Sequence, residues 1–379
     1  MEVCVINIKN QLFVVCVVCF CIHHTTSIAQ DNRSNTQVYG DLSYYYTDET
    51  DDIWSSSIDL FTAYRLDQSN TFLLEVHAER RTDHESHFEG ERWWWKHQLS
   101  DHLAFSLGRF HAPLGQWNKS FHHGIYLQDT IDRPFYLNFE HDNGFMPAHS
   151  VGFNLEGDSY FIGSVVYYKF FITNNQKLQL EHQENQHDNH AHEFHVELIP
   201  QDEVFFDDEL LIGFNINITN EQRPYEYGLY FSQQTITGDR FEHHHEEIIH
   251  DVQLYDQRIF GIDFKVRWNK LDVLSEIHYL TIEDKHDGSN HDSMGGYLQF
   301  GYNLSDRSKG TIRASFLSYD DNDSFYQVLN IRERSRLALA YRYELTPKTT
   351  VKIQWSRSFF QDDLEDLDNE LGLQFAFYY

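Results

Sequence analysis

Residues 371–379 read Leu-Gly-Leu-Gln-Phe-Ala-Phe-Tyr-Tyr, and this stretch is the clearest guide to the fold. Large apolar side chains occupy every second position: Leu371, Leu373, Phe375, Phe377 and Tyr379. Small or polar side chains, such as Gly372 and Gln374, stand between them. Successive side chains of a strand point to opposite faces, so the pattern predicts a strand with one apolar and one polar face.

The same alternation recurs along the sequence. It is clear in residues 72–78, 225–231, 260–268 and 337–345, and no region repeats apolar residues at helical spacing for long. A sheet packed on a soluble core also alternates, but the number and bulk of these apolar faces favour contact with lipid. Strands in hydrocarbon must pair every backbone group, so the sheet has to close. We therefore expect an all-β fold, a transmembrane antiparallel β-barrel.

Polar and turn-forming connections divide the predicted strands, and they alternate between short and long. The short ones are 67–70, 100–102, 157–159, 220–223, 269–270, 305–310 and 346–349. The long ones are 48–52, 82–88, 112–148, 173–206, 237–252, 283–292, 320–333 and 361–369. Seven short and eight long connections separate sixteen strands, with both termini on the side of the short turns. The count of sixteen is least secure around residues 194–206, where it could differ by two strands. Barrels of this size leave an aqueous channel.

The first 29 residues differ from the rest of the chain. Lys9 precedes an apolar run at 12–22, and Ser27-Ile28-Ala29 offers a small-x-small cleavage site. The run is too short to span a bilayer, so we expect a signal peptide at 1–29 and one barrel at 30–379. A buried first helix is the alternative. All four cysteines lie in 1–29, which excludes disulfides, thiolate metal sites and a cysteine nucleophile from the exported chain.

The longest connection near the middle, 112–148, carries distinctive motifs. GRFHAPLGQWNKSFHHG spans 108–124, TIDRPF 130–135, GFMPAH 144–149 and VGFNLEG 151–157. With the barrel pattern, these motifs make the chain resemble the bacterial outer-membrane porin superfamily, including its phosphate-selective members. The resemblance implies that residues 112–148 fold inward as a constriction loop. It also implies a homotrimer, and a final strand that is read by the outer-membrane assembly machinery.

Charged residues suit such a constriction. Those expected on the loop are Asp129, Asp132, Arg133, Glu140 and Asp142, and those expected to line the pore are Lys265, Arg267, Arg313, Arg336, Arg342 and Lys352. Opposed charges across a narrow opening create a transverse field that sorts solutes. The alternative is that they only solvate a wide lumen. The net charge of −30 departs from the basic lining of phosphate-selective relatives and favours cations, although charge in the lumen counts for more.

Histidine is abundant in two predicted extracellular loops. The clusters are His182, His187, His190, His192 and His195, then His243, His244, His245 and His250. Imidazoles interleaved with carboxylates suit divalent zinc, nickel or copper, so we expect a weakly bound divalent metal and no other cofactor. A merely polar loop and a loop whose charge responds to pH are the alternatives.

The sequence thus predicts a porin for passive diffusion of small polar or charged solutes, with cations or divalent metals favoured. The alternative is an outer-membrane barrel that captures metal on its His-rich loops, with transport incidental. No nucleophile-elbow motif supports an enzyme, and the acidic balance disfavours nucleic acid. The expected partners are outer-membrane lipid and small solutes or ions, and the expected location is the bacterial outer membrane.

Overall fold

The computed structural model describes residues 33–47, 52–82, 86–121, 125–139, 144–182, 194–201, 209–220, 223–242, 247–320, 322–361 and 367–379. The expected signal peptide at 1–29 and the loop residues Glu140 and Asp142 lie outside this set. Among the described residues, no helix is long and apolar enough to cross a membrane.

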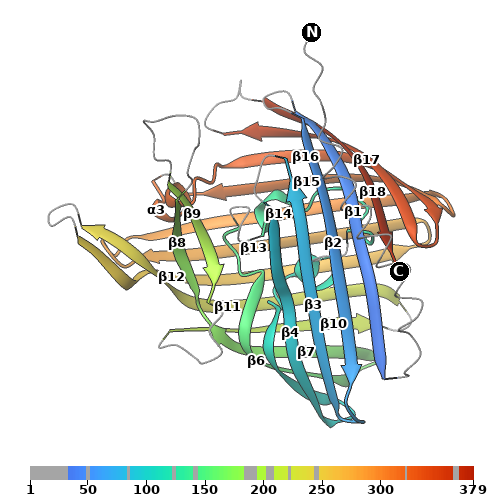
Figure 1. The fold of residues 1–379 in the computed structure, drawn as a ribbon, viewed down its shortest axis with the longest axis horizontal. Helices are drawn as coiled ribbons and strands as arrows, with labels where there is room; N and C mark the ends of the chain where they lie inside the picture. The colour runs from blue at the N-terminus through green and yellow to red at the C-terminus, as the bar shows by residue number, and fades with distance from the viewer. Residues whose placement is uncertain are drawn as a thin grey trace.

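The described strands form one sheet that closes into a barrel (Figure 1). The ring consists of β1 (Ser34–Thr47), β2 (Ile53–Arg65), β3 (Asn70–Arg81), β4 (His87–Ser100), β5 (Leu103–His111), β6 (His149–Phe161), β7 (Ser164–Asn174), β10 (Leu210–Asn220), β11 (Arg223–Glu242), β12 (Glu247–Trp268), β13 (Leu271–Asp284), β14 (Asn290–Ser305), β15 (Ser308–Tyr319), β16 (Arg334–Thr346), β17 (Thr349–Phe360) and β18 (Leu367–Tyr378). All neighbours in the ring are antiparallel, and β7 pairs with β10. The predicted sixteen-strand all-β barrel is confirmed.

The C-terminal segment that suggested the fold is the strand that closes the ring. Strand β18 pairs with β1 from Tyr378 opposite Tyr39 to Glu370 opposite Thr47. The backbone N–H of Val38 donates to the carbonyl of Tyr379 at 2.8 Å, and that of Tyr379 donates to Val38 at 2.7 Å. Closure pairs backbone groups that an open sheet edge would leave exposed to lipid.

The two faces of the ring differ as the alternation predicts. On β18, Leu373 is 50% exposed on the outside, whereas Gln374 is 2% exposed and faces inward. Leu339 on β16 and Ile262 on β12 also lie on the outer face. A band of large apolar side chains therefore surrounds the barrel, as burial in hydrocarbon requires.

One predicted turn is wrong. The connection expected at 157–159 lies at Ile162 and Gly163, because β6 continues to Phe161. Both turn residues have positive φ, 47° and 72°, as a two-residue hairpin turn that matches the strand twist requires. Gly157 is a strand residue instead, packed close to Tyr168.

The connection between β7 and β10 contains two strands outside the ring. Strands β8 (Gln176–His182) and β9 (Phe194–Pro200) form a hairpin. The prediction of sixteen strands did not include this hairpin, and β9 lies in the range 194–206 where that count was least secure. Gln234 of β11 accepts a hydrogen bond from the backbone of Gln176 at 2.9 Å. Leu178 and Leu198 of the hairpin are buried. Strand β8 also pairs in parallel with β11, with Lys177 opposite Thr237 and Leu178 opposite Gly238, so the hairpin continues the sheet beside β11.

Candidate functional site: the lumen and its inward loop

The described residues of the segment 112–148, which is called the inward loop below, lie inside the barrel and contain helix α2 (Gln116–Phe121) and the turn η1 (Phe135–Leu137). Their apolar side chains form a buried cluster with the wall of β11 to β15. The loop members are Ala112, Leu114, Trp117, Phe135, Tyr136, Phe145 and Met146. Helix α3 (Ser324–Val328) adds Phe325 and Tyr326. This part of the interior is therefore packed with apolar side chains.

The first attachment of the loop is at Glu276 on β13. The backbone N–H groups of Gln116 and Trp117 donate to Glu276 Oε2 at 3.0 and 3.2 Å. Gly115 precedes them with φ +71°, and a Cβ at this position would collide with the Glu276 carboxylate. Only glycine adopts this backbone at little cost while allowing such a close approach.

The second attachment is at Asp132. Arg313 of β15 lies 2.8 Å from Asp132 Oδ1, and Arg336 of β16 lies 3.2 Å from Oδ2. Arg313 also donates to the carbonyl oxygens of Asp132 and Arg133 at 3.0 and 3.1 Å. Burial opposes ionisation of Asp132, but the guanidinium groups of Arg313 and Arg336 keep its pKa below the ordinary value. This group is therefore a charged, buried anchor.

The third attachment is at β17. The ammonium group of Lys352 donates to the carbonyl oxygens of Ile125 and Thr130, the latter at 3.2 Å. Gln354 accepts from the backbone N–H of Ile131 at 2.9 Å. Four strands of the wall, β13, β15, β16 and β17, thus fix the course of the loop.

These contacts change the role expected for half of the basic residues predicted to line the pore. Arg313, Arg336 and Lys352 face the interior as alternation predicts, but the loop covers them. Arg313 is 2% exposed and Lys352 is fully buried. They hold the loop instead of bordering water. The sequence pattern identifies the face of a strand and not what packs on that face.

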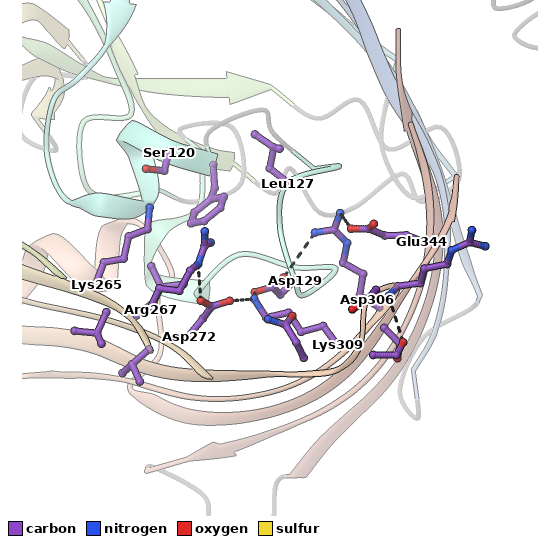
Figure 2. Close-up of a pocket in the computed structure, with 18 residues that line it drawn as sticks. Ser120, Leu127, Asp129, Lys265, Arg267, Asp272, Asp306, Lys309 and Glu344 are labelled. Carbon is purple, nitrogen blue, oxygen red and sulfur yellow. Dashed lines mark hydrogen bonds and ion pairs between the residues drawn. The ribbon is translucent and has the colours of Figure 1, made fainter. Parts of the chain in front are cut away.

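The other three predicted basic residues, Lys265, Arg267 and Arg342, line a cavity of about 510 Å³ beside the inward loop. Figure 2 shows Asp272 between Arg267 and Lys309 on the wall of this cavity. Lys309 lies 2.8 Å from Asp129 and also contacts Asp272. Arg267 lies 2.8 Å from Asp272. Acidic and basic groups nearly balance in this cavity.

Two further cavities separate the inward loop from the opposite wall. One, of about 380 Å³, lies between the loop residues Ser120 and Leu127 and strands β1, β2, β4 and β18. The other, of about 270 Å³, continues along β4 to β7. Their charged lining residues are Arg92, Lys96, Lys119 and Lys169, with Glu156 the acidic one. The lining beside the loop is therefore predominantly basic.

Sequence reasoning missed these four basic residues, although one signal was present. Arg92, Trp94 and Lys96 stand at alternate positions of β4, and all three line the second cavity. Lys96 and Lys169 both bind Glu156, Lys169 at 3.5 Å, so one acid faces two bases. Lys119, on α2, lies 3.4 Å from Asp263.

Of the remaining predicted residues, the described Arg133 does not line any of these three cavities. Arg133 stacks on Phe139 within the loop, with 3.4 Å from its guanidinium carbon to the ring centroid. His187, His190, His192, His243, His244 and His245 lie outside the described residues, and the side chains of His182, His195 and His250 are also not described. Metal binding by the His-rich loops stays a prediction.

Solved structures with the same architecture are bacterial outer-membrane porins. The anion-selective porin from Comamonas acidovorans gives a TM-score of 0.59 at 12% identity, covering 91% of this chain and 100% of that chain. In-vitro folded OmpT of Vibrio cholerae, in its trimer form, gives 0.57 at 9% identity, covering 92% and 100%. Salmonella typhi OmpF in complex with daunomycin gives 0.58 at 9% identity, covering 93% and 99%. The sequence matches no protein-family model and no curated protein. The chain thus has the porin fold.

Proposed function

We propose that this chain is a channel and not an enzyme: a water-filled pore through which small polar and charged solutes diffuse passively, with anions favoured. The path runs between the inward loop and the wall formed by β18, β1, β2 and β4 to β7. The observation that carries the anion preference is the lining of these two cavities, which exposes four basic residues and one acidic residue. The acidic partners of Arg92 and Lys119, which are Glu75 and Asp263, are buried behind them.

This preference for anions is opposite to the preference for cations that the total charge predicts. The chain carries net −30, but a passing ion responds most strongly to the charges nearest to it. A unit charge at about 4 Å changes an ion's energy by about 1 kcal/mol in water, and by more in a narrow low-dielectric opening. About 1 kcal/mol corresponds to a change of about fivefold in local concentration. The charges that line the path therefore determine the ion preference more than the charges on the outer surface do.

The zero-current potential of the purified chain in a planar lipid bilayer under a KCl gradient tests this proposal. We expect the sign that reports higher permeability for Cl⁻ than for K⁺. Replacing two of the lumen lysines, Lys96→Gln with Lys169→Gln, should shift the potential toward K⁺. Lys270→Gln, at an exposed turn, is the matched control and should leave it unchanged. A K⁺ preference in the unmodified chain would refute the anion preference.

We further propose that the barrel lies in a bacterial outer membrane after removal of residues 1–29. The apolar outer band supports the membrane location. N-terminal sequencing of the membrane-extracted chain should begin at Gln30. We also propose a homotrimer, by analogy with the Vibrio cholerae OmpT structure described as a trimer form. Its mass in detergent, determined by light scattering, tests this assembly.

A further inference from the structure

Three side chains with metal-binding groups meet on the inner wall, from three neighbouring strands. They are Glu91 of β4, His111 of β5 and His149 of β6, and one ligand atom of each lies within 4.8 Å of the other two. Glu91 Oε2 is 2.6 Å from His149 Nε2. The two imidazole rings lie 5.6 Å apart between centroids.

The backbone explains why these side chains converge. His111 and His149 are direct partners in the β5–β6 ladder, which places their side chains on the same face. In the β3–β4 ladder, Glu75 pairs with Arg92 and His77 with Glu89. Strand β4 therefore has one extra residue between these pairs, a β-bulge that includes Glu91. Bulges redirect side chains and recur beside functional sites.

The set of donor atoms selects a class of ion. Two imidazoles with one carboxylate are a known zinc ligand set, which leaves a fourth position open. Calcium and magnesium prefer oxygen ligands throughout, so this mixed set favours zinc, copper or nickel.

The cluster is also open to the lumen on one side. Glu91 and His149 are 1% and 2% exposed, whereas the more accessible His111 lines both cavities beside the inward loop. We propose that Glu91, His111 and His149 bind a divalent transition-metal ion, Zn²⁺ foremost, on the lumen wall. This site differs from the His-rich segments expected from the sequence, and it does not depend on the pore being conductive.

The competing explanation is a simple ion pair between Glu91 and His149 that fixes the start of β6. The chain contains a useful comparison, because His102 Nδ1 lies 2.9 Å from Asp158 Oδ2 at the turn between β4 and β5. Among the described residues, this pair is not part of a three-ligand cluster. His102→Gln is therefore a matched control for loss of a histidine that contacts a carboxylate.

The test measures Zn²⁺ binding by equilibrium dialysis on the folded barrel in detergent. The nine histidines of the His-rich segments are first replaced by glutamine, so that they do not contribute. This background should bind one Zn²⁺ per chain. Adding His111→Gln should weaken binding by at least about tenfold, as loss of even an outer-shell partner typically costs 10–100-fold in affinity. Adding His102→Gln should leave it unchanged.

Folding is checked in every variant by heat-modifiable electrophoretic mobility. His111 is the primary position because it is the least buried of the three, and Glu91→Gln, which keeps the shape of the side chain, is the second. The proposal would be overturned if the background chain bound no Zn²⁺. It would also be overturned if the His111→Gln and Glu91→Gln variants bound Zn²⁺ as tightly as the background chain.

Discussion

Arg313 of β15 and Asp132 of the inward loop are 181 residues apart in sequence, and their charged groups lie 2.8 Å apart. Arg313 also stacks over Trp117, with its guanidinium carbon 5.4 Å from the ring centroid. One buried side chain thus contacts two separate parts of the loop, helix α2 and the segment around Asp132. This contact keeps the loop on one side and leaves the opposite side for solutes.

Replacing Arg313 should release the loop. Arg313→Gln leaves the buried Asp132 carboxylate with Arg336 as its remaining basic partner, and breaking a buried pair typically costs about 3–5 kcal/mol. We expect the free energy of unfolding to fall by about 3 kcal/mol, near the lower end of this range, because Arg336 still pairs with Asp132. We also expect noisier single-channel currents. Urea unfolding in detergent and bilayer recordings measure the two effects.

Arg267→Gln serves as the control for that experiment. Arg267 also lies 2.8 Å from a carboxylate, that of Asp272, but its side chain is 69% exposed. Exposed pairs contribute little, so stability should barely change. Equal losses for the two variants would mean that the Arg313 contact does not anchor the loop.

Gly115→Ala should displace helix α2. The added Cβ collides with the Glu276 carboxylate, and φ of +71° is itself unfavourable for alanine. Gly163→Ala shares the backbone penalty, with φ +72°, but has open space around it. Thermal unfolding should therefore show a larger loss for Gly115→Ala. If both variants lose the same stability, the close packing against Glu276 contributes nothing.

Neighbouring residues of β5 test which face meets lipid. Leu107 lies on the outer face, 44% exposed, whereas Ser106 lines a lumen cavity. Leu107→Arg should destabilise the folded barrel in lipid vesicles by up to about 2–4 kcal/mol, as arginine at the bilayer midplane does. Ser106→Arg should reduce the stability of the folded barrel less than Leu107→Arg does, and it should lower the conductance of the channel. The reverse order would mean that the faces are assigned wrongly.

Much of the fold follows from local pattern. Alternation identifies the outer and inner residues of β3, β11, β12, β16 and β18, because each strand's preference depends only on its own side chains. Turn residues give sixteen strands in the ring. The turn at Ile162 and Gly163 was missed because isoleucine is rare at positive φ. The hairpin β8–β9 was missed because it is held by contacts with Gln234, which local pattern does not reveal.

The lumen is less predictable, since it depends on long-range packing. Lys352 and Lys96 look alike in sequence, each on the inner face of a strand. The inward loop covers Lys352 and leaves Lys96 beside a cavity. Which residues a loop covers depends on contacts such as Ile131 with Gln354, 223 residues apart. The bulge that includes Glu91 likewise becomes visible only in the β3–β4 register.

The position of the conducting path can be tested directly with a single cysteine. A chain that begins at Gln30 has no native thiol, because all four cysteines lie before it. Ser120 lies on α2 and lines the cavities on both sides of the loop. A bulky thiol reagent should sharply reduce the single-channel current of Ser120→Cys and leave that of the outer-face variant Leu107→Cys unchanged. An unchanged current after complete modification of Ser120→Cys would contradict a pore that runs beside the inward loop.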